Sequence, residues 1–118
     1  MYPFKDYYDI ISSKTYNISP TQLRGLGVEI IERTRDNAYK KHYKYKHMTQ
    51  EERGQVYDQL KEQIRTQGFE NKYPITIMLL RKKGEEDKII QGHHRLNIAI
   101  ELGITTVPVR FVYWDIVK

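Results

Sequence analysis

The order of residue types between residues 73 and 114 constrains the fold of this chain more than any other feature. Residues 73–80 are mostly β-branched or apolar, and the run is too short for a long helix, so it predicts a buried strand. Residues 82–87 are polar and contain a glycine, which predicts a turn. Residues 87–91 predict a returning strand, so the two strands are expected to pair as a hairpin.

A short helix and a last strand follow the hairpin. Gly92 precedes a predicted helix over residues 94–102, Gly103 ends it, and residues 107–114 predict the strand. The helix is expected to bury one face, formed by Leu96, Ala99, Ile100 and Leu102.

The turn at Gly92 predicts a binding site for an anion. His93, His94 and Arg95 begin the helix, where backbone N–H groups and the helix dipole favour negative charge. Arg95 can bond a phosphate through two nitrogens. His94 can donate to a phosphate oxygen or act as an acid or base, which makes it the candidate catalytic residue. In a structural alternative, His94 packs with a satisfied hydrogen bond and Arg95 pairs with an acid such as Glu101.

A second candidate binding surface is basic. Residues 33–47 carry six basic side chains and one acidic one, a charge of +5. This equals the net charge of the whole chain, which is also +5. The basic residues are Arg33, Arg35, Lys40, Lys41, Lys44 and Lys46. Tyrosines and histidines alternate with them, as on surfaces that bind nucleic acids. The alternative is a solvated helix face, with Tyr39 and Tyr43 packed inwards at a spacing of four.

The N-terminal half predicts helices. Ser19 and Pro20 form a helix-start signal. Residues 20–34 have roughly helical apolar spacing, and the helix is expected to continue through the basic segment to about residue 47. A further helix begins behind Thr49, which forms a capping box with Glu52. This helix is expected to end near Gly68, and its apolar face consists of Val56, Leu60 and Ile64.

These elements predict one α+β domain over residues 1–118, with an N-terminal helical and basic extension at about residues 20–48. The expected architecture is a small mixed sheet with three helices packed around it. One or two short strands within residues 7–18 would join the hairpin and the last strand in this sheet. Trp114 is expected to pack in the core or at the sheet edge rather than stack on a base.

Composition narrows the class of protein. A chain of 118 residues with 39% apolar residues predicts a single domain with a small core. It contains no cysteine, which excludes disulfides and thiolate chemistry. No apolar run approaches the ~18 residues of a membrane span, and the N-terminus lacks a signal-peptide pattern. We therefore expect a soluble, cytoplasmic protein without a membrane partner.

The C-terminal elements carry a family resemblance. They are Ile64–Gly68, Pro74-Ile75, Ile89-Ile90, Gly92-His93-His94-Arg95, Ala99, Leu102-Gly103 and Val107-Pro108-Val109. In this order they resemble the ParB/sulfiredoxin-like fold family, in which a return strand leads into a Gly-x-x-Arg turn, a helix with a Leu-Gly stop and a Val-Pro-Val strand. The resemblance covers about 45 of the 118 residues. It implies that His94 and Arg95 hold the phosphates of a nucleotide.

The same turn separates the branches of that family. Sulfiredoxins have Gly-Cys-His-Arg, and His93 replaces the cysteine here, so their repair chemistry is excluded. Partition ParB proteins have Gly-Glu-Arg-Arg and further nucleotide and helix-turn-helix motifs that this sequence lacks. The Gly-His-His-Arg form resembles other branches, which include a free-serine kinase and ParB-like nucleases of phages and plasmids. Separately, the small size of the chain and its richness in lysine and tyrosine lead us to expect a phage or mobile-element origin.

The resemblance also implies a nucleoside triphosphate with Mg²⁺. That ion would need a carboxylate near the phosphates, and the candidates are Asp6, Asp9, Glu29, Glu32 and Glu101. No spacing of histidines or acids predicts a dedicated metal site. Because no catalytic carboxylate stands out, the sequence leaves open whether the protein is an enzyme.

Three functions are therefore expected as alternatives. The first is a nucleotide-binding domain that hydrolyses or transfers phosphate. The second is a protein that binds DNA or RNA, or cleaves it, through the basic segment at 33–47 and the turn at 92–95. The third is a non-catalytic module that binds a protein partner or a second copy of itself.

Overall fold

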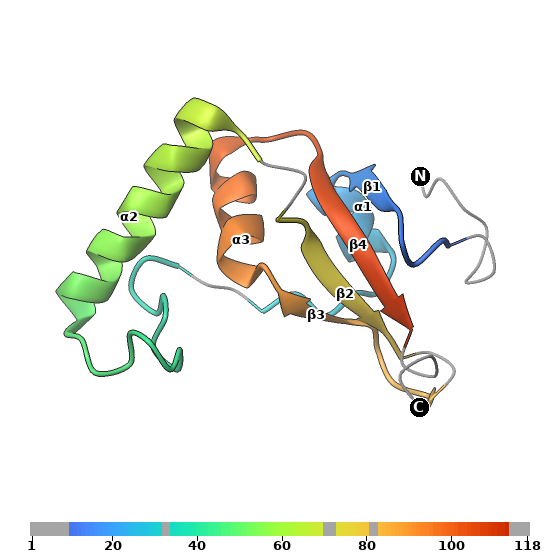
Figure 1. Cartoon of the computed structure of the whole chain (residues 1–118), viewed down its shortest axis with the longest axis horizontal. Coiled ribbons are helices and arrows are strands. Elements are labelled where there is room, and N and C mark those ends of the chain that lie inside the picture. The colour runs from blue at the N-terminus through green and yellow to red at the C-terminus, as the bar shows by residue number, and fades with distance from the viewer. Residues whose placement is uncertain (1–9, 32–33, 70–72, 81–82, 114–118) are drawn as a thin grey trace.

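A four-stranded mixed sheet with strand order β1-β4-β2-β3 forms the centre of the fold (Figure 1). The computed structural model describes residues 10–31, 34–69, 73–80 and 83–113. The strands are β1 (Thr15–Ile18), β2 (Ile75–Leu79), β3 (Lys88–Gln91) and β4 (Val107–Tyr113). The helices are α1 (Pro20–Gly25), α2 (Gln50–Gln67) and α3 (His93–Leu102). The predicted α+β class, with a small mixed sheet and three helices, is confirmed.

The strand pairing follows from the order of elements along the chain. β2 and β3 pair antiparallel as the predicted hairpin. α3 then leads the chain back, so that β4 pairs parallel to β2, while β1 pairs antiparallel to the other side of β4. Of the segment 7–18, only residues 15–18 form a strand among those described. Residues 7–9 and Trp114 lie outside the described residues.

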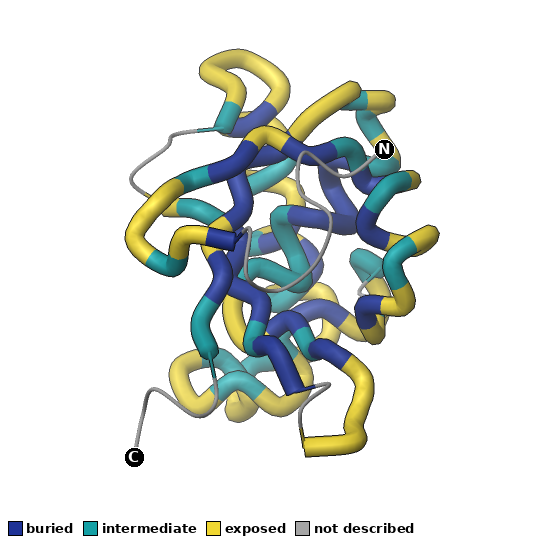
Figure 2. Tube along the Cα trace, turned by 90° about the vertical axis from the view of Figure 1, so that its right-hand side faces the viewer, coloured by how far each residue is buried: buried dark blue, intermediate teal, exposed yellow. Residues whose placement is uncertain are grey.

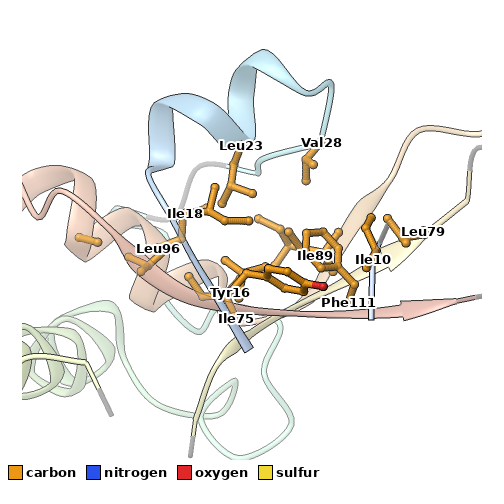
Figure 3. Packing of buried hydrophobic residues seen from close by; sticks show 14 residues of the cluster. Ile10, Tyr16, Ile18, Leu23, Val28, Ile75, Leu79, Ile89, Leu96 and Phe111 are labelled. Atoms are coloured by element: carbon orange, nitrogen blue, oxygen red, sulfur yellow. The ribbon is translucent and has the colours of Figure 1, made fainter. Parts of the chain in front are cut away.

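Two apolar clusters stabilise these layers. The larger one lies between α1 and the sheet, where Leu23 and Val28 point towards Ile18 and Phe111 (Figure 3). The smaller one joins α2 to α3 through Tyr57, Ile64 and Ile98. Buried residues gather in the interior and exposed ones in the peripheral loops (Figure 2). α3 thus packs between the sheet and α2, which fixes the position of its first turn (Figure 1).

The helix predicted behind Thr49 is confirmed, including its capping box. The Thr49 hydroxyl accepts from the Glu52 N–H, and the Glu52 carboxylate accepts from the Thr49 N–H. The predicted apolar face needs correction, because Tyr57 is fully buried while Val56 and Leu60 are only partly buried. Tyr57 packs with Ile64 in the smaller cluster, and Leu60 lies against that cluster. In α3, Leu96 and Ala99 are buried as predicted, whereas Ile100 and Leu102 are partly buried.

The long helix predicted from residue 20 to about residue 47 is wrong. Its start is confirmed, since Ser19 caps α1 and Pro20 begins it, but α1 ends at Gly25. Gly27 has a φ of 77°, a left-handed conformation that stops the helix.

Residues 34–47 form a succession of turns instead of a helix. Within them only Ala38 is fully buried, so little apolar surface is available to stabilise a helix here by packing. Lysines at positions 40 and 44 would also repel each other one turn apart. Tyr43 is 74% exposed rather than packed inwards. In the described ranges, no helix is both long and apolar enough to cross a membrane.

Candidate functional site

Gly92 sets the position of the turn that begins α3. It has a φ of 105° and a ψ of 18°, and a Cβ there would lie 3.0 Å from Cγ1 and 3.2 Å from Cα of Ile75. Only glycine combines this backbone conformation with so close an approach to β2. The capping boxes of α1 and α2 have no counterpart here, because Gly92 has no capping side chain and the first turn of α3 contains no acidic residue. The positive end of the α3 dipole is therefore not offset locally by an acid.

The Arg95 side chain folds back under this turn. Its guanidinium donates to the carbonyl oxygens of Tyr73 and Pro74. Burial lowers the pKa of Arg95, and the electrostatic interaction with the Tyr39 side chain acts in the opposite direction. The alternative pairing of Arg95 with Glu101 is wrong. The Glu101 carboxylate instead accepts from the Tyr57 hydroxyl and from Lys61 Nζ, at 2.7 Å for the latter.

His94 connects the turn to the basic segment. Its Nε2 accepts a hydrogen bond of 3.0 Å from the backbone N–H of Tyr39. The two rings are stacked, with centroids 4.1 Å apart and planes at 10°. The backbone of Tyr39 has a φ of 58°, a strained value for a tyrosine. Burial, followed by the influence of Tyr45, raises the pKa of the Tyr39 hydroxyl to about 12, so this hydroxyl is neutral at pH 7.

The described part of the basic segment, residues 34–47, is also anchored to α2. The Arg35 guanidinium pairs with Glu51 at 3.1 Å and with Asp58 at 2.9 Å. A Cβ at Gly54 would lie 2.7 Å from Cζ of Arg35, so the guanidinium lies directly against this glycine. Ala38 is buried in the cluster between α2 and α3. The segment is therefore held at one end by α2 and in its middle by α3.

These contacts leave a hollow of about 610 Å³ between the basic segment and the start of α3. Figure 1 shows residues 34–47 looping beside the lower part of α2, on the side that faces α3, and the Tyr39 N–H donates to His94 in the first turn of α3. The segment contributes Asn37, Tyr39, Lys40, Lys41 and His42, and the residues facing them include Gln91, Gly92, His93, His94 and Arg95. A hollow of this size can hold a nucleotide. We call it the α3 hollow.

The charge of the α3 hollow is positive. Its described lining contains Lys40, Lys41 and Arg95 and no carboxylate. Because Mg²⁺ requires oxygen ligands such as carboxylates, this lining does not fit a protein-held magnesium ion. Of the carboxylates considered for Mg²⁺, Glu29 and Glu101 do not line the hollow, and Asp6, Asp9 and Glu32 lie outside the described residues. The described residues contain no group of three or more potential metal ligands.

The structure thus brings together part of each predicted site. Lys40 and Lys41 join the turn at Gly92–Arg95, whereas Lys44 and Lys46 lie on the same segment but outside the hollow. Arg35 is held by α2, and Arg33 lies outside the described residues.

Two residues that shape this region, Asn37 and Asn97, are not predicted from the sequence to belong to a site. Asn37 lines the hollow, as does His42, one of the histidines that alternate with the basic residues. Asn97 is buried in α3, and its amide donates to the carbonyl oxygens of His93 at 3.0 Å and Ile31 at 3.3 Å. A polar residue between Leu96 and Ile98 was the available signal, because a buried amide requires partners.

No protein-family model matches the chain, and comparison with curated proteins finds no significantly similar sequence.

Proposed function

We propose that this protein binds the phosphates of a nucleotide in the α3 hollow. One observation carries the proposal: two lysines of the basic segment and the His-His-Arg turn line the same hollow. Lysines and a helix start are both favourable partners for phosphate oxygens. Their coincidence is more informative than either alone, because charged loops and helix starts are common features.

The proposed role of each residue follows from its contacts. Lys40 and Lys41 are exposed and supply mobile positive charge. The backbone at His93–Arg95 supplies the positive end of α3. Arg95 adds positive charge to the lining while its guanidinium donates to Tyr73 and Pro74, which precede β2. His94 orders the basic segment, so we assign it a positioning role.

We propose ligand binding rather than catalysis. The lone pair of His94 Nε2 is used by the Tyr39 N–H, so in this conformation that nitrogen cannot serve as a general base. The described lining of the hollow also offers no carboxylate as an alternative base.

The proposal includes membership of the ParB/sulfiredoxin-like fold family, in a branch with Gly-His-His-Arg. The sequence of hairpin, glycine turn, helix and parallel strand supports it, since β3, Gly92, α3 and β4 follow one another as the resemblance implies. A phage or mobile-element origin belongs to the same proposal.

Binding of adenosine triphosphate to the full chain, measured by calorimetry, tests the proposed function. The double variant Lys40→Ala/Lys41→Ala should weaken binding at least tenfold, since a hydrogen bond to a charged group contributes about 1.5–3 kcal/mol. Binding should persist in a chelator, because the described lining holds no carboxylate for Mg²⁺. Comparing the affinity for adenosine triphosphate with the affinities for uridine triphosphate and inorganic tripolyphosphate shows whether the base contributes to binding.

The matched control is Lys14→Ala/Lys83→Ala, which removes the same charge from exposed positions outside the hollow. It should bind like the parent chain. Equal losses in both double variants would mean that net charge alone attracts the ligand. If no triphosphate binds, the proposed nucleotide site is wrong. The non-catalytic interaction module then becomes the better explanation only if DNA and RNA also fail to bind.

A further inference from the structure

We infer that the ligand of this surface is a single-stranded nucleic acid, with one base stacked on Tyr43 and its neighbouring phosphates on the lysines of the basic segment. This inference rests on the proposed phosphate site and names the class of its ligand. The observation behind it is a series of packed rings that runs from the hollow to an exposed tyrosine.

The ring series begins at the start of α3. His94 stacks on Tyr39, whose ring meets Tyr45 edge-on at 5.0 Å. His42 lies 5.1 Å from Tyr45, and Tyr43 stacks on His42 with centroids 5.0 Å apart and planes at 17°. Tyr43 therefore ends a continuous aromatic path from the hollow to the surface.

Tyr43 has the geometry of a stacking platform. Its ring packs on His42, yet the residue is 74% exposed, more than any other large hydrophobic residue among those described. With one ring face against His42, the other face is accessible. An exposed ring held in place by a neighbour is suited to receive a nucleobase, because little conformational freedom is lost on binding.

The backbone around Tyr43 is ordered by turns. The N–H of Tyr45 donates to the His42 carbonyl at 3.0 Å, and that of Lys46 donates to the same oxygen at 2.8 Å. The N–H of Lys44 donates to His42 Nδ1 at 3.2 Å. These bonds hold the backbone and ring of His42, on which Tyr43 stacks, so the platform exists before a ligand binds.

Basic residues lie on both sides of Tyr43 in the sequence. Lys40 and Lys41 precede it, Lys44 and Lys46 follow it, and residues 37–47 contain no acidic side chain. All four lysines are exposed. Lysines alternating with a stacking ring match the repeating phosphate and base of a single strand. A duplex keeps its bases stacked inside the helix, so it cannot place one face-on against Tyr43.

The test is fluorescence anisotropy of the full chain with labelled 12-mers. The probes are oligothymidine, oligouridine and a DNA duplex of equal length, and the first two distinguish DNA from RNA. We expect a single strand to bind more tightly than the duplex. Tyr43→Ala should weaken single-strand binding by roughly 5- to 150-fold, the range for one lost stacked base. Tyr43→Phe should bind like the parent, because stacking needs the ring and not the hydroxyl.

Salt dependence provides a second readout. Replacing Lys44 and Lys46 with alanine should reduce the slope of log affinity against log salt by roughly 1.4, or 0.7 for each phosphate contact with a single strand. The Lys14→Ala/Lys83→Ala control should leave the slope unchanged.

The outcomes separate this inference from the proposed function. If triphosphates bind but the Tyr43→Ala and parent chains bind every single strand equally, or bind none, the inference is wrong and the nucleotide site stands. Equal affinity for duplex and single strand also overturns it, because it indicates phosphate contacts alone. If neither triphosphate nor oligonucleotide binds, both are wrong.

Discussion

At the scale of single residues, the contact between Tyr39 and His94 positions the basic segment against the start of α3. Tyr39 is the single non-glycine residue with positive φ among those described, a conformation that costs roughly 1–2 kcal/mol. Its N–H bond to His94 Nε2 and its ring stacking offset that cost. The contact joins positions 55 residues apart.

Amide hydrogen exchange at Tyr39 tests this contact. In His94→Ala the acceptor and the stacking partner are both lost, so protection of the Tyr39 amide should fall by at least tenfold. His94→Gln retains an acceptor at similar reach and should keep part of the protection. If exchange at Tyr39 is unchanged in His94→Ala, His94 does not hold the basic segment.

A comparison of two glycines tests the close approach at the turn. Gly92→Ala should destabilise the protein by about 2–4 kcal/mol, because the positive φ is strained and the Cβ would press on Ile75. Gly103→Ala, at a φ of 69° with open space around it, should cost only about 1–2 kcal/mol. Chemical denaturation measures both free energies. Equal losses would mean that contact with Ile75 is unimportant.

Among the site residues, the sequence predicts where α3 begins, but it does not predict the contacts that the side chains of its first turn make. The alternative in which His94 is packed with a satisfied hydrogen bond agrees with the structure. Two lysines of the basic segment line the same hollow as this turn. The sequence does not predict that the Tyr39 N–H donates to His94. It also does not predict that Arg95 donates to backbone carbonyls before β2. Both contacts depend on tertiary packing between distant segments, which residue types and spacing do not encode locally.

At the scale of elements, local signals predicted those parts of the chain that have their own start and stop residues. Thr49 and Glu52 begin α2, and Gly92 and Gly103 bound α3. The basic segment lacked such signals. The helix predicted there is wrong because the conformation of the segment is set by its attachments to α2 and α3.

The stabilisation that Glu101 gives to the packing of α2 against α3 should depend on pH. Burial raises the pKa of Glu101, but hydrogen bonds from Lys61 and Tyr57 outweigh it and hold the pKa below 4.5. A lowered folded-state pKa stabilises the fold above about pH 4.5, and that stabilisation is lost as the pH falls through the folded value. The partly exposed pair should contribute no more than about 1 kcal/mol.

Denaturation of the parent and Glu101→Gln at several pH values measures this contribution. The difference in free energy of unfolding should be largest near pH 7 and should shrink below pH 4.5. A difference that stays constant between pH 3 and pH 7 would mean that the ionised carboxylate is not what joins the helices.

At the scale of the whole molecule, the net charge of +5 equals the excess carried by residues 33–47. The fold places part of this excess against the positive end of α3, which adds to the charge instead of neutralising it. Such an arrangement costs folding free energy through repulsion, and an anionic ligand would remove that cost. Ligand binding should therefore stabilise the fold as well as fill the hollow.

The most direct test of the account is a titration of the ¹⁵N-labelled full chain with adenosine triphosphate, followed by NMR. The account predicts that the amide resonances of residues 92–95 and 39–41 shift together and saturate with one dissociation constant. Resonances of the distant hairpin turn at residues 83–86 should not move. Shifts confined to other regions, or shifts of the basic segment without those at the start of α3, would contradict it.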